Sequence, residues 1–467
     1  MKHIFFLLFI FLPSIIFAQT IPQKLQTAFT QFEKDPQLSY AISSLYVIDA
    51  KTGKVVFEKN ARVGLAPAST QKIITSVTSF EILKKDFKYE TKLQAVGNIK
   101  NKDSTLEGNL YLIGSGDPTF GSNRYSNTKS YQILNAFTTA IQKKGIKQIT
   151  QPLSYNFRTY SNQAIPDGWI MQDIGNYYGA AANILNWKEN QFDIVLNSEE
   201  GKDEAVSIIS PKNKTFINEL KAGSKGSGDN AYCYLPTQGN TWVLTGSIPK
   251  GEQKFTIAAA DNEPAKTMLF DLSFALKQKG IKTNGVEDFR AELIKLNFAV
   301  IDGTERVDLY THYSPSLDSI IYWFNKKSIN LYGEALLKTM GNKVKGNADS
   351  SLAVVKSFWV SKGIDKNELN MFDGSGLSPL NRVTTHAQVE ILKYAATKDW
   401  YKYFLQALPI YNGMTMKSGS ITNVKGFCGY HTAKDGSSYI FSFLVNNFNG
   451  KGGEVANKMF KVLDVLK

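Results

Sequence analysis

Ser69 and Lys72 form an S-x-x-K pattern inside the stretch LAPASTQKIIT at residues 65–75. On a helix, side chains three positions apart lie on one face, so the Ser69 hydroxyl and the Lys72 amine can meet. A serine beside a basic amine suits nucleophilic catalysis. A serine near a helix start is also a common N-cap, and a lysine one turn later is commonly a solvated charge. The stretch alone leaves both interpretations open.

A second pair of polar residues lies at a predicted helix-helix junction. Residues 316–340 carry an apolar helical stripe that breaks near the sequence KKSIN and then resumes. The break presents Ser328 and Asn330, which can project into a cleft between the two helices. A capping role for the serine is the ordinary alternative.

A third group of residues lies on a predicted strand. The sequence MKSGS supplies a cation at Lys417, a hydroxyl at Ser418, a glycine at Gly419 and a second hydroxyl at Ser420. A glycine within a strand often marks a close approach to the backbone, so we expect Gly419 to admit a ligand. The triplet Lys417-Ser418-Gly419 indicates little by itself and becomes informative only together with the other two groups.

In this order, S-x-x-K, S-x-N and K-[ST]-G form the set that penicillin-recognising acyl-serine enzymes use. The sequence resembles the D-alanyl-D-alanine carboxypeptidase/endopeptidase family, the low-molecular-mass penicillin-binding proteins with a large insertion in the catalytic domain. The resemblance covers nearly all of the mature chain and includes GNLYLIGSGDPTF, GNYYGAAANILNW, DGSGLSPLNRVT and KSGSITNVKGFCGY. The long interval between Ser69 and Ser328 agrees with such an insertion.

The resemblance implies a role for each motif residue. Ser69 would attack the carbonyl of a D-Ala-D-Xaa bond, and Lys72 would accept its proton. Lys72 can do so only when neutral, so we expect burial and the nearby Lys417 to lower its pKa. Ser328 would relay a proton to the leaving amine, and Asn330 would hold Lys72 and the substrate amide. Lys417 would support the relay as a fixed charge.

The strand motif would bind the substrate. The resemblance assigns Ser418 and Ser420 to the terminal carboxylate, beside Gly419, and the backbone N–H groups of Ser69 and Ser420 to an oxyanion hole. Ser418 replaces the threonine that is commoner in the family, which keeps the hydroxyl. No metal site and no cofactor are expected, because the chain has four histidines and two cysteines without close pairing.

Some family members bind the charged end of diaminopimelate, and these resemble one another in two further residues. Neither residue is in the expected place in this sequence. The first is an acidic residue from the insertion, where LSYNFRTY offers Tyr155 and Asn156. The second is an arginine after DGSGLS, where Pro379 stands. Arg382 or Arg158 are candidate substitutes, so specificity for the stem peptide stays open.

The elements around the motifs predict an α/β (α+β) fold. SSLYVIDAKTGKVVFEKN predicts a β-hairpin, and residues 71–83 a core helix. GMTMKSGS, FCGYHTA and SSYIFSFLVNN predict three strands before a closing helix with an apolar face at Val455, Met459, Val462 and Leu466. We expect both chain ends to build one antiparallel sheet flanked by helices. The resemblance implies the penicillin-binding-protein/β-lactamase-like serine transpeptidase fold.

The domain prediction follows from this arrangement. Residues 19–88 and 264–467 would form a split catalytic domain, and residues 89–263 an insertion of one or two mostly-β subdomains. Residues 1–18 read as a signal peptide, with one basic residue, an apolar run and a small residue before polar sequence. An uncleaved anchor is the alternative. We expect export to the periplasm.

Composition restricts the partners. The formal charge of +13 suits an anionic partner such as a cell envelope polymer, and permits peripheral association with the envelope. Nucleic acid is not expected, because the lysines are scattered and the protein would be exported. Cys233 and Cys428 lie among apolar neighbours and read as buried free thiols, with a disulfide as the alternative. The oligomeric state is not predicted.

The leading hypothesis is a serine-type peptidase that acts on peptidoglycan stem peptides, by carboxypeptidase cleavage, endopeptidase cleavage of cross-links, or both. β-Lactam antibiotics would be covalent inhibitors. The same motifs would serve a β-lactamase or esterase, which differs in how fast water removes the acyl group. A catalytically idle envelope-binding protein is a third reading, against which stands the presence of Ser69, Lys72, Ser328, Asn330 and Lys417.

Overall fold

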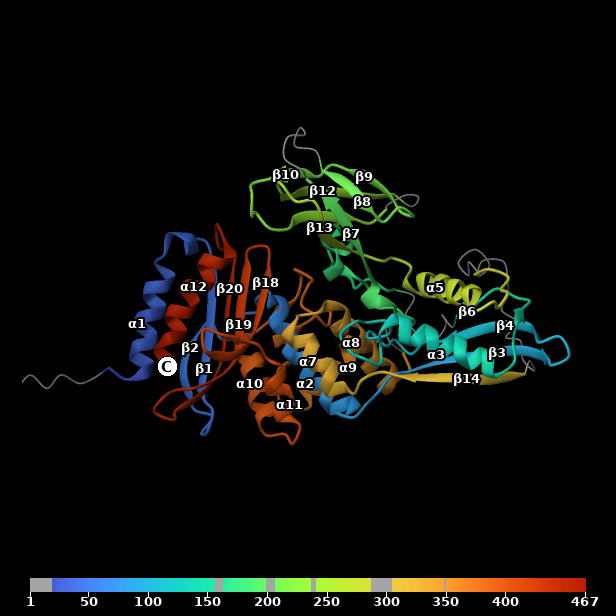
Figure 1. The fold of residues 1–467 in the computed structure, drawn as a ribbon. Helices are drawn as coiled ribbons and strands as arrows, with labels where there is room; N and C mark the ends of the chain where they lie inside the picture. The colour runs from blue at the N-terminus through green and yellow to red at the C-terminus, as the bar shows by residue number, and fades with distance from the viewer. Residues whose placement is uncertain (1–18, 156–162, 199–205, 237–240, 287–304, 348–349) are drawn as a thin grey trace, which may run out of the picture.

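The structure is a computed structural model, drawn in Figure 1. It describes residues 19–155, 163–198, 206–236, 241–286, 305–347 and 350–467. The predicted signal peptide, residues 1–18, lies outside them. No helix in these ranges is long and apolar enough to cross a membrane.

One six-stranded antiparallel sheet joins the two ends of the chain. Its order is β17-β18-β19-β20-β1-β2. The strands are β1 (Ile42–Asp49), β2 (Val55–Lys59), β17 (Ile410–Tyr411), β18 (Met414–Ile421), β19 (Val424–Thr432) and β20 (Ser438–Asn446). The pairing of β1 with β20 places the N-terminal hairpin in the same sheet as the MKSGS strand, as the sequence predicts.

Helices cover both faces of this sheet (Figure 1). α1 (Ile21–Glu33) and α12 (Gly452–Leu463) pack on one face, where their core includes Phe441 and Phe443 of β20. The neighbouring Ile440 points to the other face, because successive strand side chains alternate. That face is covered by α2 (Lys72–Leu83), α7 (Leu317–Lys326), α8 (Asn330–Lys345), α9 (Ser351–Val360), α10 (Thr385–Ala396) and α11 (Tyr401–Ala407). The predicted fold class is confirmed.

Two further hydrophobic cores lie between α2 and α7 in sequence. The first is built from β3 (Glu90–Lys100), β4 (Thr105–Ile113), β5 (Gln148–Ile149), β6 (Ser154–Tyr155), β14 (Arg306–Tyr313), α3 (Ser130–Lys143) and α5 (Pro264–Gln278). The second, at the top of Figure 1, is built from β7 (Gln191–Asn197), β8 (Ser207–Ser210), β9 (Thr215–Asn218), β10 (Lys221–Gly223), β11 (Asn230–Tyr234), β12 (Thr241–Pro249) and β13 (Phe255–Ala260).

The inserted region extends further than the predicted boundary at residue 263. α5 buries Met268 and Leu272 in the first inserted core, and β14 pairs with β3. The chain crosses between the catalytic domain and this core at Tyr89 and Ser314, where the Ser314 N–H donates to the Tyr89 carbonyl at 3.0 Å. The sequence shows that α5 has an apolar stripe but not which core receives it. The described residues between 264 and 313 therefore belong with the insertion.

The two cysteines lie in different cores. Cys233 is buried on β11 and Cys428 on β19, and both are free. Burial raises the pKa of the Cys233 thiol to about 12. The predicted buried free thiols are confirmed.

Candidate active site

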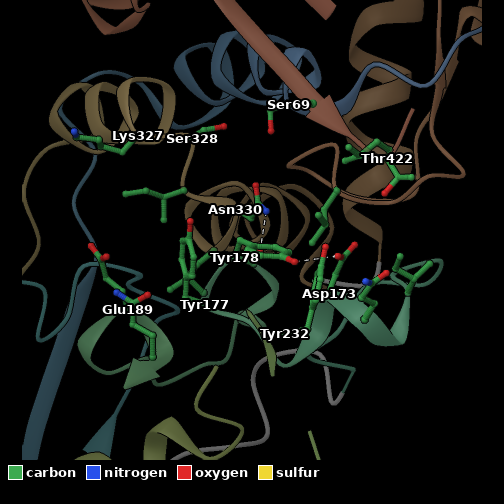
Figure 2. Close-up of a pocket in the computed structure, with 18 of the residues that line it drawn as sticks. Ser69, Asp173, Tyr177, Tyr178, Glu189, Tyr232, Lys327, Ser328, Asn330 and Thr422 are labelled. Atoms are coloured by element: carbon green, nitrogen blue, oxygen red, sulfur yellow. Dashed lines mark hydrogen bonds between the residues drawn. The ribbon is translucent and has the colours of Figure 1, made fainter. Parts of the chain in front are cut away.

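A cleft of about 440 Å³ lies between the catalytic domain and the inserted region. Ser69, Ser328, Asn330 and Ser420 line it together, although they come from three separate stretches of the chain. Figure 2 shows Ser69 and Asn330 near its middle. Among the predicted residues, Lys72 and Lys417 are buried behind this surface.

Ser69 lies in a short 3-10 helix, Ala68–Gln71, that leads directly into α2. Lys72 is the first residue of α2 and has no exposed surface. Its Nζ lies 2.9 Å from Ser69 Oγ, which is the contact that the S-x-x-K spacing predicts. Serine and lysine therefore form a pair and not a cap beside a solvated charge.

The other contacts of Lys72 decide which way its amine faces. Nζ donates to Asn330 Oδ1 at 2.6 Å and to the Ser375 carbonyl at 2.7 Å. Both partners are oxygen acceptors without a hydrogen to give. A neutral amine has two hydrogens and one lone pair, so these contacts use both hydrogens and leave the lone pair for Ser69. Asn330 is held in this orientation because its Nδ2 donates to the Tyr178 carbonyl at 2.8 Å.

The surroundings of Lys72 favour the neutral amine. Burial and then the nearby Lys417 hold the pKa of Lys72 well below the usual lysine value. Asp373 and Glu334 act in the opposite direction. Since an amine can accept a proton only when neutral, this environment suits a general base.

The junction between α7 and α8 is the predicted break. Ser328 has a φ of 56°, in the left-handed region, and Asn330 begins α8. Lys417 Nζ lies 3.1 Å from Ser328 Oγ and donates to the Ser418 carbonyl at 2.8 Å. Ser328 thus links the cleft to the buried Lys417.

Lys417 differs from the permanent charge that we expected. Burial, with a smaller contribution from Lys425, lowers the pKa of Lys417 to about 7, against the opposing effect of Cys428. Its ammonium is therefore lost as the pH rises through neutrality. The hydrogen bond to Ser328 remains available in either state, because a hydroxyl both donates and accepts.

Gly419 is required by the chain itself. A Cβ at this position would lie 2.6 Å from the Pro67 carbonyl oxygen and 2.9 Å from Ser69 N. We expected the glycine to admit a ligand to the strand; instead it lets β18 approach the backbone that carries Ser69. Ser420 follows it on the cleft surface, whereas Ser418 is not among the residues that line the cleft.

Sequence reasoning missed Asp173 and Tyr178. Asp173 lies in α4 (Met171–Ile174) of the inserted region and lines the end of the cleft that Tyr232 and Thr422 share (Figure 2). Tyr178 donates its hydroxyl to Asp173 Oδ1 at 3.3 Å, and burial raises the pKa of Asp173. The available signal was its position two residues before GNYYGAAANILNW, which begins at Gly175, although the acid itself lies outside that phrase.

The positions first considered for stem-peptide binding are elsewhere. Tyr155 packs on the first inserted core, and Asn156 and Arg158 lie outside the described residues. Arg382 is exposed and donates to the carbonyls of Pro379 and Asn381. Pro379 itself lines the cleft.

Basic side chains of the described cleft lining are confined to its other end. Lys327 lies there, on the side of Glu189 (Figure 2), and Arg124 also lines the cleft and pairs with Glu189. Arg124 donates to both carboxylate oxygens of Glu189, at 2.8 and 3.1 Å. The cleft therefore has an acid at the Asp173 end, and the Arg124–Glu189 ion pair together with Lys327 at the opposite end.

The chain is similar to known proteins over nearly its whole length. Residues 25–466 match the D-Ala-D-Ala carboxypeptidase 3 (S13) family. The chain belongs to this family. It is a serine-type D-alanyl-D-alanine carboxypeptidase by family, so the predicted family and class of activity are confirmed.

Two proteins similar to this chain carry the name D-alanyl-D-alanine carboxypeptidase. A D-alanyl-D-alanine carboxypeptidase of Actinomadura sp. (strain R39) is 25% identical, with 89% of this chain and 80% of that protein covered. The D-alanyl-D-alanine carboxypeptidase DacB of Haemophilus influenzae is 24% identical, covering 85% and 83%. The crystal structure of penicillin binding protein 4 from Haemophilus influenzae has the same fold, with a TM-score of 0.78, 19% identity and coverage of 94% and 98%.

Proposed function

We propose that this protein hydrolyses D-Ala-D-Xaa bonds in peptidoglycan stem peptides through an acyl-enzyme on Ser69. The observation that carries the proposal is the contact set of Lys72, whose two acceptor contacts leave its lone pair for the Ser69 hydroxyl. That arrangement activates the serine as a nucleophile. Membership of the S13 family supports the choice of substrate.

The reaction follows from the positions of these groups. Ser69 Oγ attacks the carbonyl carbon while its proton moves to Lys72. The backbone N–H groups of Ser69 and Ser420 stabilise the oxyanion, a device worth roughly 10²- to 10³-fold in rate per donor. Ser328 delivers a proton to the leaving amine and is reprotonated from Lys417 or Lys72. Water then cleaves the Ser69 ester and releases the shortened peptide.

The ends of the cleft bind the two sides of the scissile bond. Ser420, which lines the cleft, binds the terminal carboxylate, whereas the role expected of Ser418 stays a prediction because Ser418 does not line the cleft. Asp173, at the end of the cleft without basic lining residues, binds an ammonium group on the side chain of the stem peptide. Because Pro379 stands where family members carry an arginine, a free carboxylate beside that ammonium would meet no cation among the described lining residues. Lysine-type or amidated side chains suit this cleft.

We further propose that the protein is exported to the periplasm after cleavage behind Ala18, and that its charge of +13 holds it near the envelope. Cleavage of cross-links accompanies release of terminal D-Ala, since the cleft continues past Ser328 towards Lys327. N-terminal sequencing of the secreted protein tests the first point. Purified cross-linked muropeptides test the second.

The central experiment measures acylation and turnover together. The protein is incubated with labelled penicillin and, separately, with a stem pentapeptide that ends in D-Ala-D-Ala. We expect one adduct on Ser69 and release of one D-Ala per peptide. Rapid steady turnover of penicillin would establish a β-lactamase instead, and the absence of both an adduct and D-Ala release would leave only a binding function.

A further inference from the structure

The carbonyl of Ser375 is the acceptor that no motif assigns. It lies in the segment DGSGLS, residues 373–378, between β15 (Leu369–Asn370) and β16 (Arg382–Val383). This carbonyl accepts a hydrogen from Lys72 Nζ at 2.7 Å. Its position therefore fixes where the lone pair of a neutral Lys72 points.

Buried carboxylates hold the backbone N–H groups of the residues on both sides of Ser375. The Gly374 N–H donates to Glu334, with distances of 2.9 and 3.2 Å to its two oxygens. The Gly376 N–H donates to Asp373 Oδ1 at 2.8 Å. With its neighbours bound in this way, the Ser375 carbonyl has little freedom to turn away from Lys72.

Each carboxylate is itself anchored. Glu334 lies four residues after Asn330 on α8, so both project from the same helix face towards the Lys72 site. Asp373 has no exposed surface. Its carboxylate accepts five hydrogen bonds, from Gln71, Trp169, Gly376, Ser378 and Asn381. Glu334 is nearly as buried, at 1% exposure.

Residues 373–378 also pack closely against the backbone that carries Ser69. A Cβ at Gly376, which has a φ of +83°, would lie 1.9 Å from the Ala68 carbonyl oxygen. Thr75, one turn after Lys72 on α2, donates to the Gly374 carbonyl at 2.6 Å. The segment therefore cannot shift without moving the backbone beside Ser69.

We propose that Glu334 and Asp373 are positioning residues for acylation, which hold the Ser375 carbonyl so that Lys72 presents its lone pair to Ser69. This inference rests on the proposed function, because it assigns a task to groups around the proposed base. Neither carboxylate touches the substrate. Their effect on the rate passes through Lys72.

The charges of the two carboxylates supply a second, separable effect. The charged groups that face Lys72 are Lys417 from β18, Asp373 from the segment and Glu334 from α8. Burial and the proximity of Asp373 raise the pKa of Glu334 to about 7. An ionised Glu334 raises the pKa of Lys72, so removal of this charge lowers the pH at which Lys72 becomes neutral.

Two substitutions separate contact from charge. Glu334→Gln keeps an oxygen acceptor for the Gly374 N–H and removes the charge. Glu334→Asp keeps the charge, but its shorter side chain moves the carboxylate away from the Gly374 N–H. The second-order rate of penicillin acylation is measured from pH 5 to 9. We expect Glu334→Gln to retain its plateau rate and to move the acidic limb to lower pH. We expect Glu334→Asp to lose roughly tenfold in plateau rate with the acidic limb nearly in place.

Glu368→Gln is the matched control. Glu368 is also buried, but its partners are Arg62, Thr384 and His386. This variant should lose thermal stability without a change in the pH profile of acylation. Glu334 variants that match the wild type in both plateau and acidic limb would overturn the proposal, as would a uniform loss of stability with unchanged kinetics. Failure of wild-type Ser69 to be labelled would instead overturn the proposed function.

Discussion

Replacing each of the two buried lysines by arginine tests which one is the base. Lys72→Arg keeps a cation that can donate to Asn330 and Ser375, but a guanidinium does not lose its proton near neutral pH and has no lone pair for Ser69. A general base contributes roughly 10²- to 10⁴-fold to a rate. We therefore expect acylation by penicillin to fall at least about 100-fold beyond the loss caused by the larger side chain alone.

Lys417→Arg supplies the reference for that steric loss. Lys417 is as buried as Lys72, with 1% exposure, and its contacts to Ser328 and the Ser418 carbonyl require only a donor. Overpacking of a buried site costs about 1–3 kcal/mol, and a cost of about 1.4 kcal/mol in the transition state is tenfold in rate. We expect a loss near tenfold for this variant.

The assay is the second-order rate constant for penicillin acylation, followed as a function of pH on variants whose thermal unfolding shows a folded protein. Since the pKa of Lys417 is about 7, the wild type loses this ammonium as pH rises through neutrality, whereas Lys417→Arg keeps its charge. Any decline in rate that comes from that loss should disappear in the variant. Equal losses for the two arginine variants would refute the assignment of Lys72 as the base.

Three further predictions concern the serine, the cleft end and the strand. Ser69→Ala should abolish penicillin labelling with unfolding behaviour unchanged, and peptide mapping that places the wild-type adduct on Ser328 or Ser375 would contradict the assignment. Asp173→Asn should raise KM roughly tenfold for stem peptides with a side-chain ammonium. The same variant should leave penicillin acylation unchanged, because penicillin acylation does not need that contact. Equal effects on both substrates would exclude an ammonium site. Gly419→Ala should lower both Tm and the acylation rate, since its Cβ would lie 2.9 Å from Ser69 N; an unaffected rate would show that the strand can yield there.

The sequence predicts the elements that carry the motifs because each motif has a local physical signature. The spacing of Ser69 and Lys72 is a helical spacing, and the two residues are in contact. The break before Asn330 interrupts an apolar stripe, and α8 begins there. The nearly continuous apolar run along β20 is typical of a strand buried on both faces, and seven consecutive residues of β20 are buried. These features depend on neighbours in sequence, which a single chain displays.

Other features depend on contacts across long separations, which no local pattern encodes. The carbonyl of Ser375 contacts Lys72, which is 303 positions away in the sequence. Because every residue has a backbone carbonyl, the residue type at position 375 does not reveal this contact. Asp173 becomes a cleft residue only because the inserted region folds over the catalytic domain. The end of the insertion was misplaced at residue 263 for the same reason, since an apolar helix such as α5 fits either core. Roles of the individual site residues stay predictions until acylation is measured.

The inserted region takes part in the geometry of catalysis as well as in the shape of the cleft. The Tyr178 carbonyl fixes the amide of Asn330, at 2.8 Å from Nδ2, and so decides that Oδ1 faces Lys72. Trp169 donates to Asp373 at 2.9 Å, and Asp373 holds the loop that carries the Ser375 carbonyl. Both acceptors of the Lys72 amine are thus supported by residues of the insertion. Without these residues, the S-x-x-K pair would remain on its helix, but its amine would lack the constraints that direct the lone pair to Ser69.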